Sequence, residues 1–179
     1  MGKIFAVEYV TLDGVFEEPG VWSGPYFNKE LEKFQQDNLW ECDGLLLGRV
    51  TYEGFAQAWP AMEAETGDFG VRMNSIPKWV ASTTLTEPTW NASVLDGDVP
   101  TAVAALKERD LTLMVAGSAT LVEALRANGL IDEYRLMIYP VVAGSGRRLI
   151  GDGAAPSELK LTDVTTTGNG VIVALYVPA

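Results

Sequence analysis

Three short segments of the chain combine glycine with hydroxyl or cationic side chains, a combination that suits phosphate binding. They are Gly48-Arg49-Val50-Thr51, Ser82-Thr83-Thr84-Leu85 and Ala116-Gly117-Ser118-Ala119-Thr120-Leu121. Glycine lets an anion approach the backbone, arginine provides a forked cation, and serine and threonine add hydroxyl donors. Each segment follows an apolar run, where a strand would end and a helix N-terminus could bind an anion. Each alone is more typical of helix capping, but together they predict a polyphosphate site across several strand ends.

Other kinds of chemistry are excluded by what the chain lacks. It has no histidine and one cysteine, Cys42, so Ser-His-Asp or Cys-His catalysis and imidazole-based zinc sites cannot be built. Cys42 lies in the apolar segment Trp40–Leu47, which indicates a buried and unreactive thiol. Glu63, Glu65 and Asp68 are interpreted as a solvated acidic loop, and no metal site is predicted. Hydride transfer suits such a chain, because a bound cofactor carries that chemistry and the protein mainly positions the reactants.

The overall charge narrows the classes of partner. Thirteen Lys and Arg residues against 24 Asp and Glu residues give a net charge of -11, which repels nucleic acids and anionic membranes. A local basic pocket for a small anion remains compatible with this charge. The length of 179 residues predicts one domain over residues 1–179. No apolar run approaches the ~20 residues of a membrane span, and no signal segment is recognised, so we expect a cytoplasmic protein.

The elements that would position the three segments alternate between strand and helix as far as Gly129. Apolar and β-branched runs predict strands at Lys3–Val10, Cys42–Gly48, Lys78–Ser82, Ser93–Leu95, Leu111–Ala116 and Ile131–Val142. Amphipathic spacing predicts helices at Tyr26–Trp40, Arg49–Trp59, Phe69–Asn74, Pro100–Arg109 and Gly117–Asn128, the first of them opened by Pro25. Leu159–Thr167 and Val171–Val177 should form a terminal hairpin. This order predicts the α/β class: a mixed, mostly parallel central sheet flanked by helices, with a C-terminal antiparallel hairpin.

Several of these segments resemble a known family. Leu47–Glu53 is similar to the Gly-Arg-x-Thr segment of the dihydrofolate reductase fold. The reductase domain of the bifunctional deaminase-reductase of riboflavin biosynthesis, the RibD C-terminal domain, shares a longer pattern. The matching segments are Thr11–Gly14, Val115–Ser118 with Leu121, Gly129–Glu133, Tyr139–Val142 and Gly144–Gly146. The likeness extends from about Lys3 to Val177.

The resemblance implies a dihydrofolate reductase-like fold that binds NADPH and reduces a small heterocyclic or carbonyl substrate. Carried over residue by residue, the cofactor contacts would be Gly48, Arg49 and Thr51 for the phosphates, Ser82 and Thr83 near the adenosine ribose, and Gly117, Ser118, Ala119, Thr120 and Leu121 around the pyrophosphate. It also implies a homodimer, with Ile131–Val142 or the terminal hairpin as the interface. The zinc signature of the deaminase half cannot be built without histidine, so we expect a stand-alone reductase.

Two positions depart from the family pattern. The fold usually has Gly-Gly, joined by a cis peptide, where this chain has Ala116-Gly117. Family members often carry an arginine for the cofactor 2′-phosphate where this chain has Thr83. Arg49 could take over that contact, and NADH therefore stays open as a cofactor beside NADPH.

The substrate side offers fewer signals. Asp13 is the candidate catalytic residue, either orienting a pyrimidine-like or pteridine-like ring or relaying a proton, although Asp-Gly is also a common turn dipeptide. Trp22, Tyr26 and Phe55 could line a flat pocket, or they could belong to the core. Arg147 and Arg148 form the one clustered basic pair that could meet a phosphoribosyl group. The alternative function is a non-catalytic nucleotide-binding or ligand-sensing module on the same fold.

Overall fold

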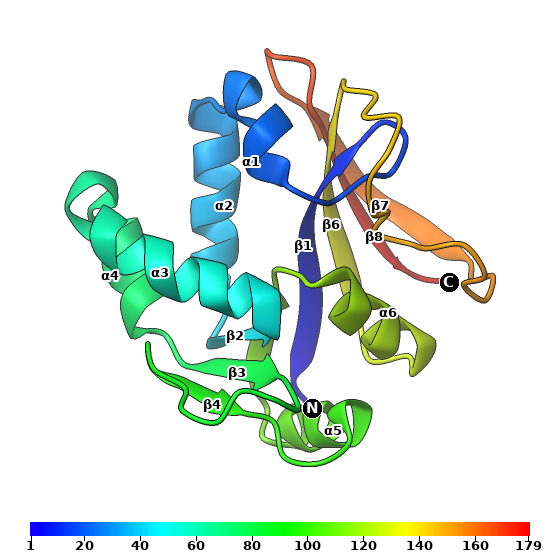
Figure 1. Cartoon of the computed structure of the whole chain (residues 1–179). Helices are drawn as coiled ribbons and strands as arrows, with labels where there is room; N and C mark the ends of the chain where they lie inside the picture. Colours follow the sequence, from blue (N-terminus) through cyan, green and yellow to red (C-terminus); the bar gives the residue numbers. More distant parts are fainter.

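A single eight-stranded sheet runs through the computed structural model, which describes residues Met1–Ala179. The strand order is β4-β3-β2-β5-β1-β6-β8-β7 (Figure 1). The strands are β1 (Lys3–Thr11), β2 (Gly44–Gly48), β3 (Lys78–Ala81), β4 (Ala92–Val94), β5 (Thr112–Val115), β6 (Glu133–Tyr139), β7 (Leu159–Thr166) and β8 (Ile172–Pro178). The first six pair in parallel, whereas β8 runs antiparallel to β6 and β7 antiparallel to β8. The predicted mostly parallel sheet with a terminal antiparallel hairpin is confirmed.

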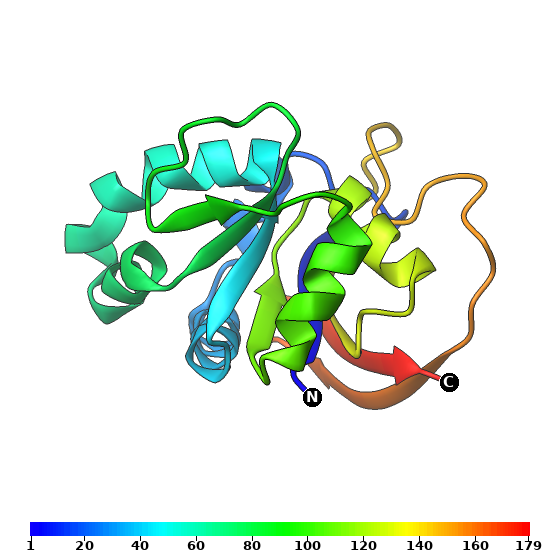
Figure 2. The same ribbon diagram turned by 90° about the horizontal axis from the view of Figure 1, so that it is seen from below.

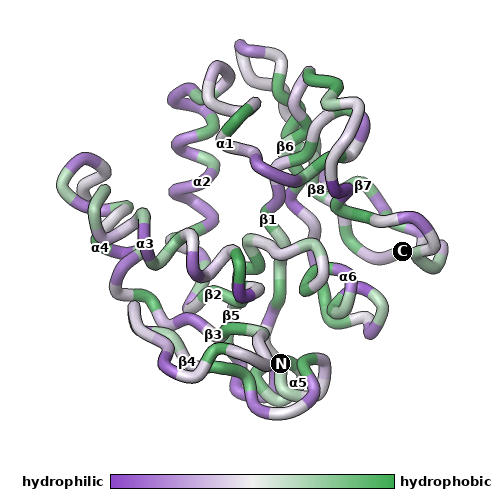
Figure 3. Tube along the Cα trace, viewed as in Figure 1, coloured by the Kyte–Doolittle hydropathy of each residue, from purple (hydrophilic) through white to green (hydrophobic).

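Helices cover both faces of this sheet (Figure 2). They are α1 (Pro19–Trp22), α2 (Lys29–Glu41), α3 (Arg49–Thr66), α4 (Asp68–Ser75), α5 (Val99–Glu108) and α6 (Ala119–Ala127), with a 3-10 turn at Gly24–Tyr26. Phe5 and Val7 of β1 pack with α2, α3 and α4, while Ile4 and Ala6 pack with α5 and α6. Successive strand residues face opposite sides, so this alternation places one apolar cluster on each face. Hydrophobic positions accordingly concentrate along the central strands (Figure 3).

Several element boundaries differ from the predictions, and side-chain contacts explain two of the differences. Helix α2 begins at Lys29 rather than Tyr26, because the Asn28 side chain accepts the N–H groups of Glu30 and Leu31, at 3.1 and 3.0 Å. Helix α6 begins at Ala119 rather than Gly117, because the Ser118 hydroxyl caps it by accepting the Leu121 N–H at 3.4 Å. Strand β6 is shorter than the predicted Ile131–Val142 and spans Glu133–Tyr139.

Helix α3 continues through Pro60 to Thr66, although we predicted that it ends at Trp59 and that an acidic loop follows. Packing against α4 accounts for the extension, since the Trp59 and Phe69 rings lie 5.3 Å apart and the Asn74 amide donates to the Glu63 carboxylate at 2.6 Å. The acidic residues Glu63 and Glu65 are therefore helical rather than part of a loop. Neither α3 nor any other helix is long and apolar enough to cross a membrane.

An ion pair between a buried lysine and a half-buried aspartate joins α5, β1 and the loop before β6. Lys107 of α5 donates to both Asp132 carboxylate oxygens at 2.7 and 2.8 Å, and Asp132 also accepts the Ile4 N–H of β1 at 2.7 Å. The Lys107 side chain is 9% exposed, and Asp132 is the one carboxylate paired with its ammonium group. Removal of one partner from a buried pair leaves an uncompensated charge, which costs more than the pair itself contributes.

We therefore expect Asp132→Ala to lower the free energy of unfolding by about 2 kcal/mol or more, as measured by urea denaturation. Asp37→Ala is the matched control, because Asp37 pairs only with the exposed Lys33 on the surface of α2, and its loss should cost less than about 1 kcal/mol. Equal losses in the two variants would contradict the assigned role of Asp132.

Candidate active site

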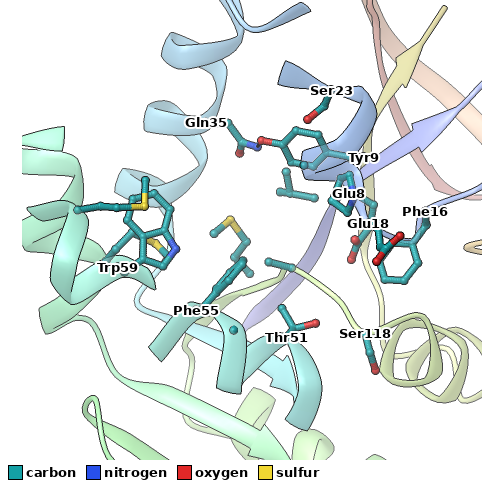
Figure 4. A pocket seen from close by; sticks show the side chains of 18 of the residues that line it. Glu8, Tyr9, Phe16, Glu18, Ser23, Gln35, Thr51, Phe55, Trp59 and Ser118 are labelled. Atoms are coloured by element: carbon teal, nitrogen blue, oxygen red, sulfur yellow. Dashed lines mark hydrogen bonds between the residues drawn. The ribbon is translucent and has the colours of Figure 1, made fainter. Parts of the chain in front are cut away.

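A large cavity lies where the carboxyl ends of β1, β2 and β5 meet the helices (Figure 4). Its volume is about 1580 Å³, and it is bounded by α2, α3, the start of α4 and the loop that follows β1. Ligand sites in open α/β sheets lie at this edge, because helix N-termini converge there. The cavity is therefore the candidate active site.

One end of the cavity is built from the N-termini of α3 and α6. Gly48 caps α3 without a side chain, so no side chain satisfies the N–H groups of its first turn. The Gly48 N–H donates to the Gly117 carbonyl at 3.0 Å, and a Cβ at Gly48 would collide with Ser118. Glycine is thus required for the two helix ends to approach each other. This end of the cavity combines free N–H groups with helix dipoles, which favours a phosphate.

Six predicted contacts fall at this junction, and four of their side chains line the cavity. These four are Arg49 and Thr51 of α3, and Ser118 and Thr120 at the start of α6. Gly48 and Gly117 form the backbone between them. The cis peptide joins Gly117 to Ser118, one position later than the Ala116-Gly117 pair at which the family pattern places it.

The remaining predicted cofactor residues do not line the cavity. Ser82 accepts the N–H groups of Thr84 and Leu85 at 3.1 and 2.9 Å and so closes a turn, and Thr83 is exposed beside it. The side chains of Ala119 and Leu121 are buried in the core. Contact of Ser82 and Thr83 with the cofactor ribose stays a prediction.

Asp13 lies outside the cavity and holds two loops together. Its Oδ1 accepts the Thr11 hydroxyl at 2.6 Å and the Ala143 N–H at 3.0 Å, and its Oδ2 accepts the Gly144 N–H at 2.8 Å. These donors hold the pKa of the carboxyl well below its usual range, the Thr11 hydroxyl first among them. All three contacts are those of a residue that closes a turn and joins two loops, as the Asp-Gly dipeptide indicated, and a catalytic role for Asp13 stays a prediction.

The three predicted substrate aromatics separate into two groups. Phe55 of α3 lines the cavity, whereas Trp22 and Tyr26 do not. Trp22 and Tyr26 pack edge-on against the buried Tyr139 ring, with centroids 5.2 and 5.8 Å away. Tyr139 stacks in turn on Tyr9, which does line the cavity, so Trp22 and Tyr26 support the wall from behind.

The two arginines of the basic pair, Arg147 and Arg148, also have different surroundings. The Arg147 side chain lines the cavity and donates to the Thr120 hydroxyl of α6, and its backbone N–H donates to the Glu17 carboxylate at 3.0 Å. Arg148 is directed elsewhere and donates to the Asp13 carbonyl at 3.1 Å. Only Arg147 of the pair can therefore meet a ligand in the cavity.

Glu8 is the polar residue of the cavity that sequence reasoning missed. It is 3% exposed; its Oε1 accepts the Gly117 N–H at 2.9 Å, while Oε2 has no hydrogen-bond partner in the chain. Burial raises the pKa of Glu8 to about 8, against the lowering effect of the Gly117 N–H. At neutral pH the group is mostly a carboxylic acid. The sequence did contain a signal for this residue, because Glu8 is a charged side chain within the otherwise apolar run of β1.

Metal chemistry finds no support in the arrangement of side chains. No three His, Cys, Asp or Glu residues are grouped so that they could hold a metal ion. Burial raises the pKa of the Cys42 thiol to about 12, in agreement with the predicted inert thiol.

The sequence matches the family of the RibD C-terminal domain over residues 3–173. YyaP of Bacillus subtilis (strain 168), an uncharacterised protein, is 30% identical over 145 residues, which cover 78% of this chain and 76% of YyaP. The crystal structure of a protein from Shewanella sp. PV-4, named as a riboflavin biosynthesis protein, superposes on this chain with a TM-score of 0.81. The two sequences are 18% identical, and the superposition covers 99% of both chains.

A second solved structure is a diaminohydroxyphosphoribosylaminopyrimidine deaminase/5-amino-6-(5-phosphoribosylamino)uracil reductase from Thermotoga maritima. It superposes with a TM-score of 0.69 at 15% identity over 99% of this chain. This chain spans only 57% of that longer protein. These likenesses establish a shared fold with reductase-like proteins of riboflavin biosynthesis.

The raised pKa of Glu8 predicts a specific dependence of stability on pH. Between the unfolded value of 4.5 and the folded value of about 8 the folded state binds more protons, so stability falls as the pH rises through this window. Glu8→Gln keeps an oxygen for the Gly117 N–H and removes the titration. Relative to this variant, the wild type should lose up to about 1.4 kcal/mol per pH unit in urea unfolding experiments.

Glu18→Gln is the control for this measurement, because Glu18 lines the same cavity but is exposed. Its stability should follow that of the wild type at each pH. A wild type and a Glu8→Gln variant with parallel pH profiles would refute the assignment of a neutral Glu8.

Proposed function

Because the chain belongs to the family of the RibD C-terminal domain, we propose that it is an NADPH-dependent reductase of a small heterocyclic or carbonyl compound. The observation that carries the proposal is the meeting of the α3 and α6 N-termini at one end of a large cavity. The Thermotoga protein, a reductase in name, supports the same class of reaction through its fold. We do not assign the phosphoribosyl substrate in that protein's name to this chain.

The residues at this end of the cavity fit the phosphates of the cofactor. Arg49 offers a guanidinium group, which Glu53 holds at 2.9 and 3.0 Å on the exposed side of α3. Thr51, Ser118 and Thr120 offer hydroxyl groups, and the uncapped first turn of α3 offers backbone N–H groups. A bound NADPH would supply a hydride at its nicotinamide ring.

Reduction of a C=N or C=O bond requires a proton in addition to the hydride. Glu8 lies at the floor of the cavity as a carboxylic acid with one oxygen free of partners in the chain. We assign it as the group that holds this proton and donates it to the substrate nitrogen or oxygen as the carbon is reduced. Phe16 and Phe55, which also line the cavity, exclude water from this part of it.

The proposal predicts that NADPH quenches the tryptophan fluorescence with a saturable profile. Arg49→Ala should weaken binding by about 10-fold or more, because a charge-assisted contact to a phosphate is lost. Arg109→Ala serves as the control, because Arg109 lies at the end of α5 beside Trp79, away from the cavity. The same titration with NADH reports whether Arg49 recognises the 2′-phosphate.

Two outcomes of that titration would change the conclusion. Folded protein that binds neither cofactor would exclude the reductase. Saturable binding without steady oxidation of NADPH in the presence of any heterocyclic or carbonyl substrate would favour the alternative, a non-catalytic sensor of nucleotides.

We further propose that the chain forms a homodimer through the terminal hairpin. The other candidate interface, Ile131–Val142, contains β6, which is paired on both sides by β1 and β8 and is thus unavailable. The hairpin instead exposes a row of apolar side chains, each 37–49% exposed: Leu159, Leu161, Val164 and Ile172. Their pairing partners place them on one face of β7 and β8.

Charge on this face should separate the protomers. We expect a dimer for the wild type and a monomer for the double variant Leu161→Glu, Val164→Glu in size-exclusion chromatography with light scattering. Lys160→Glu, which alters the opposite face of the same strand, should remain dimeric. Monomeric wild type at micromolar concentration would exclude this interface.

A further inference from the structure

The two ends of the cavity differ in charge. Its only cationic side chains are Arg49 and Arg147, and both belong to the end formed by α3 and α6. The other end lies between α2, α3 and α4 and is lined by the aromatic residues Phe55, Trp59 and Phe69. Its charged residues are all acidic: Glu32 of α2, Glu65 of α3 and Asp68 of α4. Positive charge is thus confined to the cofactor end.

The acidic end of the cavity offers no cation to compensate a phosphate. Of the other basic side chains on the adjoining helices, Lys33 pairs with Asp37 at 2.6 Å and Arg72 donates to the Leu39 and Cys42 carbonyls at 2.8 and 2.7 Å. Lys29, the first residue of α2, does not line the cavity. The N-terminus of α4, which reaches the cavity, begins with Asp68, so its dipole already faces a carboxylate. A phosphate dianion placed here would gain no cationic partner and would be repelled by Glu32, Glu65 and Asp68, although the first turn of α4 has no side-chain cap.

The same end is well suited to a flat ring. The Phe55 and Trp59 rings meet edge to face at 6.4 Å and form an apolar wall on α3. Opposite them, the Gln35 amide donates to the Tyr9 hydroxyl at 2.6 Å, which leaves the Gln35 carbonyl oxygen without a partner in the chain (Figure 4). That oxygen can accept a ring N–H or amino group. Aromatic walls and acidic side chains also favour a ring that carries positive charge.

We infer that the substrate of this chain is a flat heterocycle without a phosphate group, uncharged or cationic, bound between α2 and α3. The inference rests on the proposed function, because it assigns the basic end of the cavity to the cofactor. The inferred substrate differs from the phosphoribosyl compound in the name of the Thermotoga protein, although the two proteins share a fold. The acidic residues at the rim would act as a filter against phosphorylated relatives of the substrate.

The test compares ligand pairs that differ only in a phosphate group. The probes are uridine with uridine 5′-phosphate and riboflavin with riboflavin 5′-phosphate, each titrated into the full chain saturated with NADPH. Saturation with NADPH prevents the probe phosphates from occupying the basic end. We expect the unphosphorylated member of at least one pair to bind about 10-fold more tightly at low salt, and the ratio to shrink as salt screens the charges.

A charge variant identifies the source of the discrimination. The triple variant Glu32→Gln, Glu65→Gln, Asp68→Asn should bring the ratio close to one without loss of NADPH binding. The matched control is Glu108→Gln, Asp152→Asn, Asp163→Asn, which removes the same amount of charge from exposed residues outside the cavity and should keep the wild-type ratio.

The outcomes separate this inference from the proposed function. Equal or tighter binding of the phosphorylated members would overturn the inference, as would the absence of binding by both unphosphorylated compounds. A charge variant with an unchanged ratio would overturn the role of the acidic rim. Failure of the proposed function would appear earlier, as a chain that NADPH itself does not bind.

Discussion

The contact between Gly48 and the Gly117–Ser118 peptide is the constraint on which the candidate site depends. It joins the ends of β2 and β5, which are neighbours in the sheet, and brings the helices that follow them to one point. A side chain at Gly48 would collide with Ser118 and separate α3 from α6. Two helix N-termini would then no longer act on one ligand, and their combined dipoles would be lost to it. The small size of one residue thereby determines where an anion can bind.

Much of this arrangement could be predicted from the sequence, because apolar runs indicate the strands and glycines indicate the turns between elements. The Leu45–Leu47 run predicts a strand buried on both faces, and the turn Gly168-Asn169-Gly170 predicts the hairpin. Boundaries were predicted less well. The end of α3 depends on packing against α4, and Pro60 argues against the continuation that this packing stabilises. Local propensity cannot report a contact with a helix that follows later in the chain.

The lining of the cavity near the α3 and α6 N-termini was predictable, whereas most of its other lining residues were not. Glycine, arginine and hydroxyl residues after apolar runs indicated helix N-termini at one sheet edge, and Arg49, Thr51, Ser118 and Thr120 do line the cavity there. Glu8 was missed because its significance lies in burial, which depends on the loop from β5 to α6. Asp13 was predicted to be catalytic because it is a carboxylate that follows a strand. Its hydrogen-bond donors include residues 143 and 144, which lie far along the chain. Residue type indicates possible chemistry, and only the tertiary fold decides exposure.

The two loops that Asp13 joins form one unit rather than two. Besides the Asp13 bonds, the Phe16 N–H donates to the Arg147 carbonyl and the Leu149 N–H donates to the Gly14 carbonyl, at 3.0 Å each. The loop after β1 carries part of the cavity wall, so it cannot open unless the loop after β6 moves with it. Backbone amides of both loops should then exchange with solvent in a single cooperative event. Any separation of these two loops would therefore break contacts between segments about 130 residues apart in the chain at the same time.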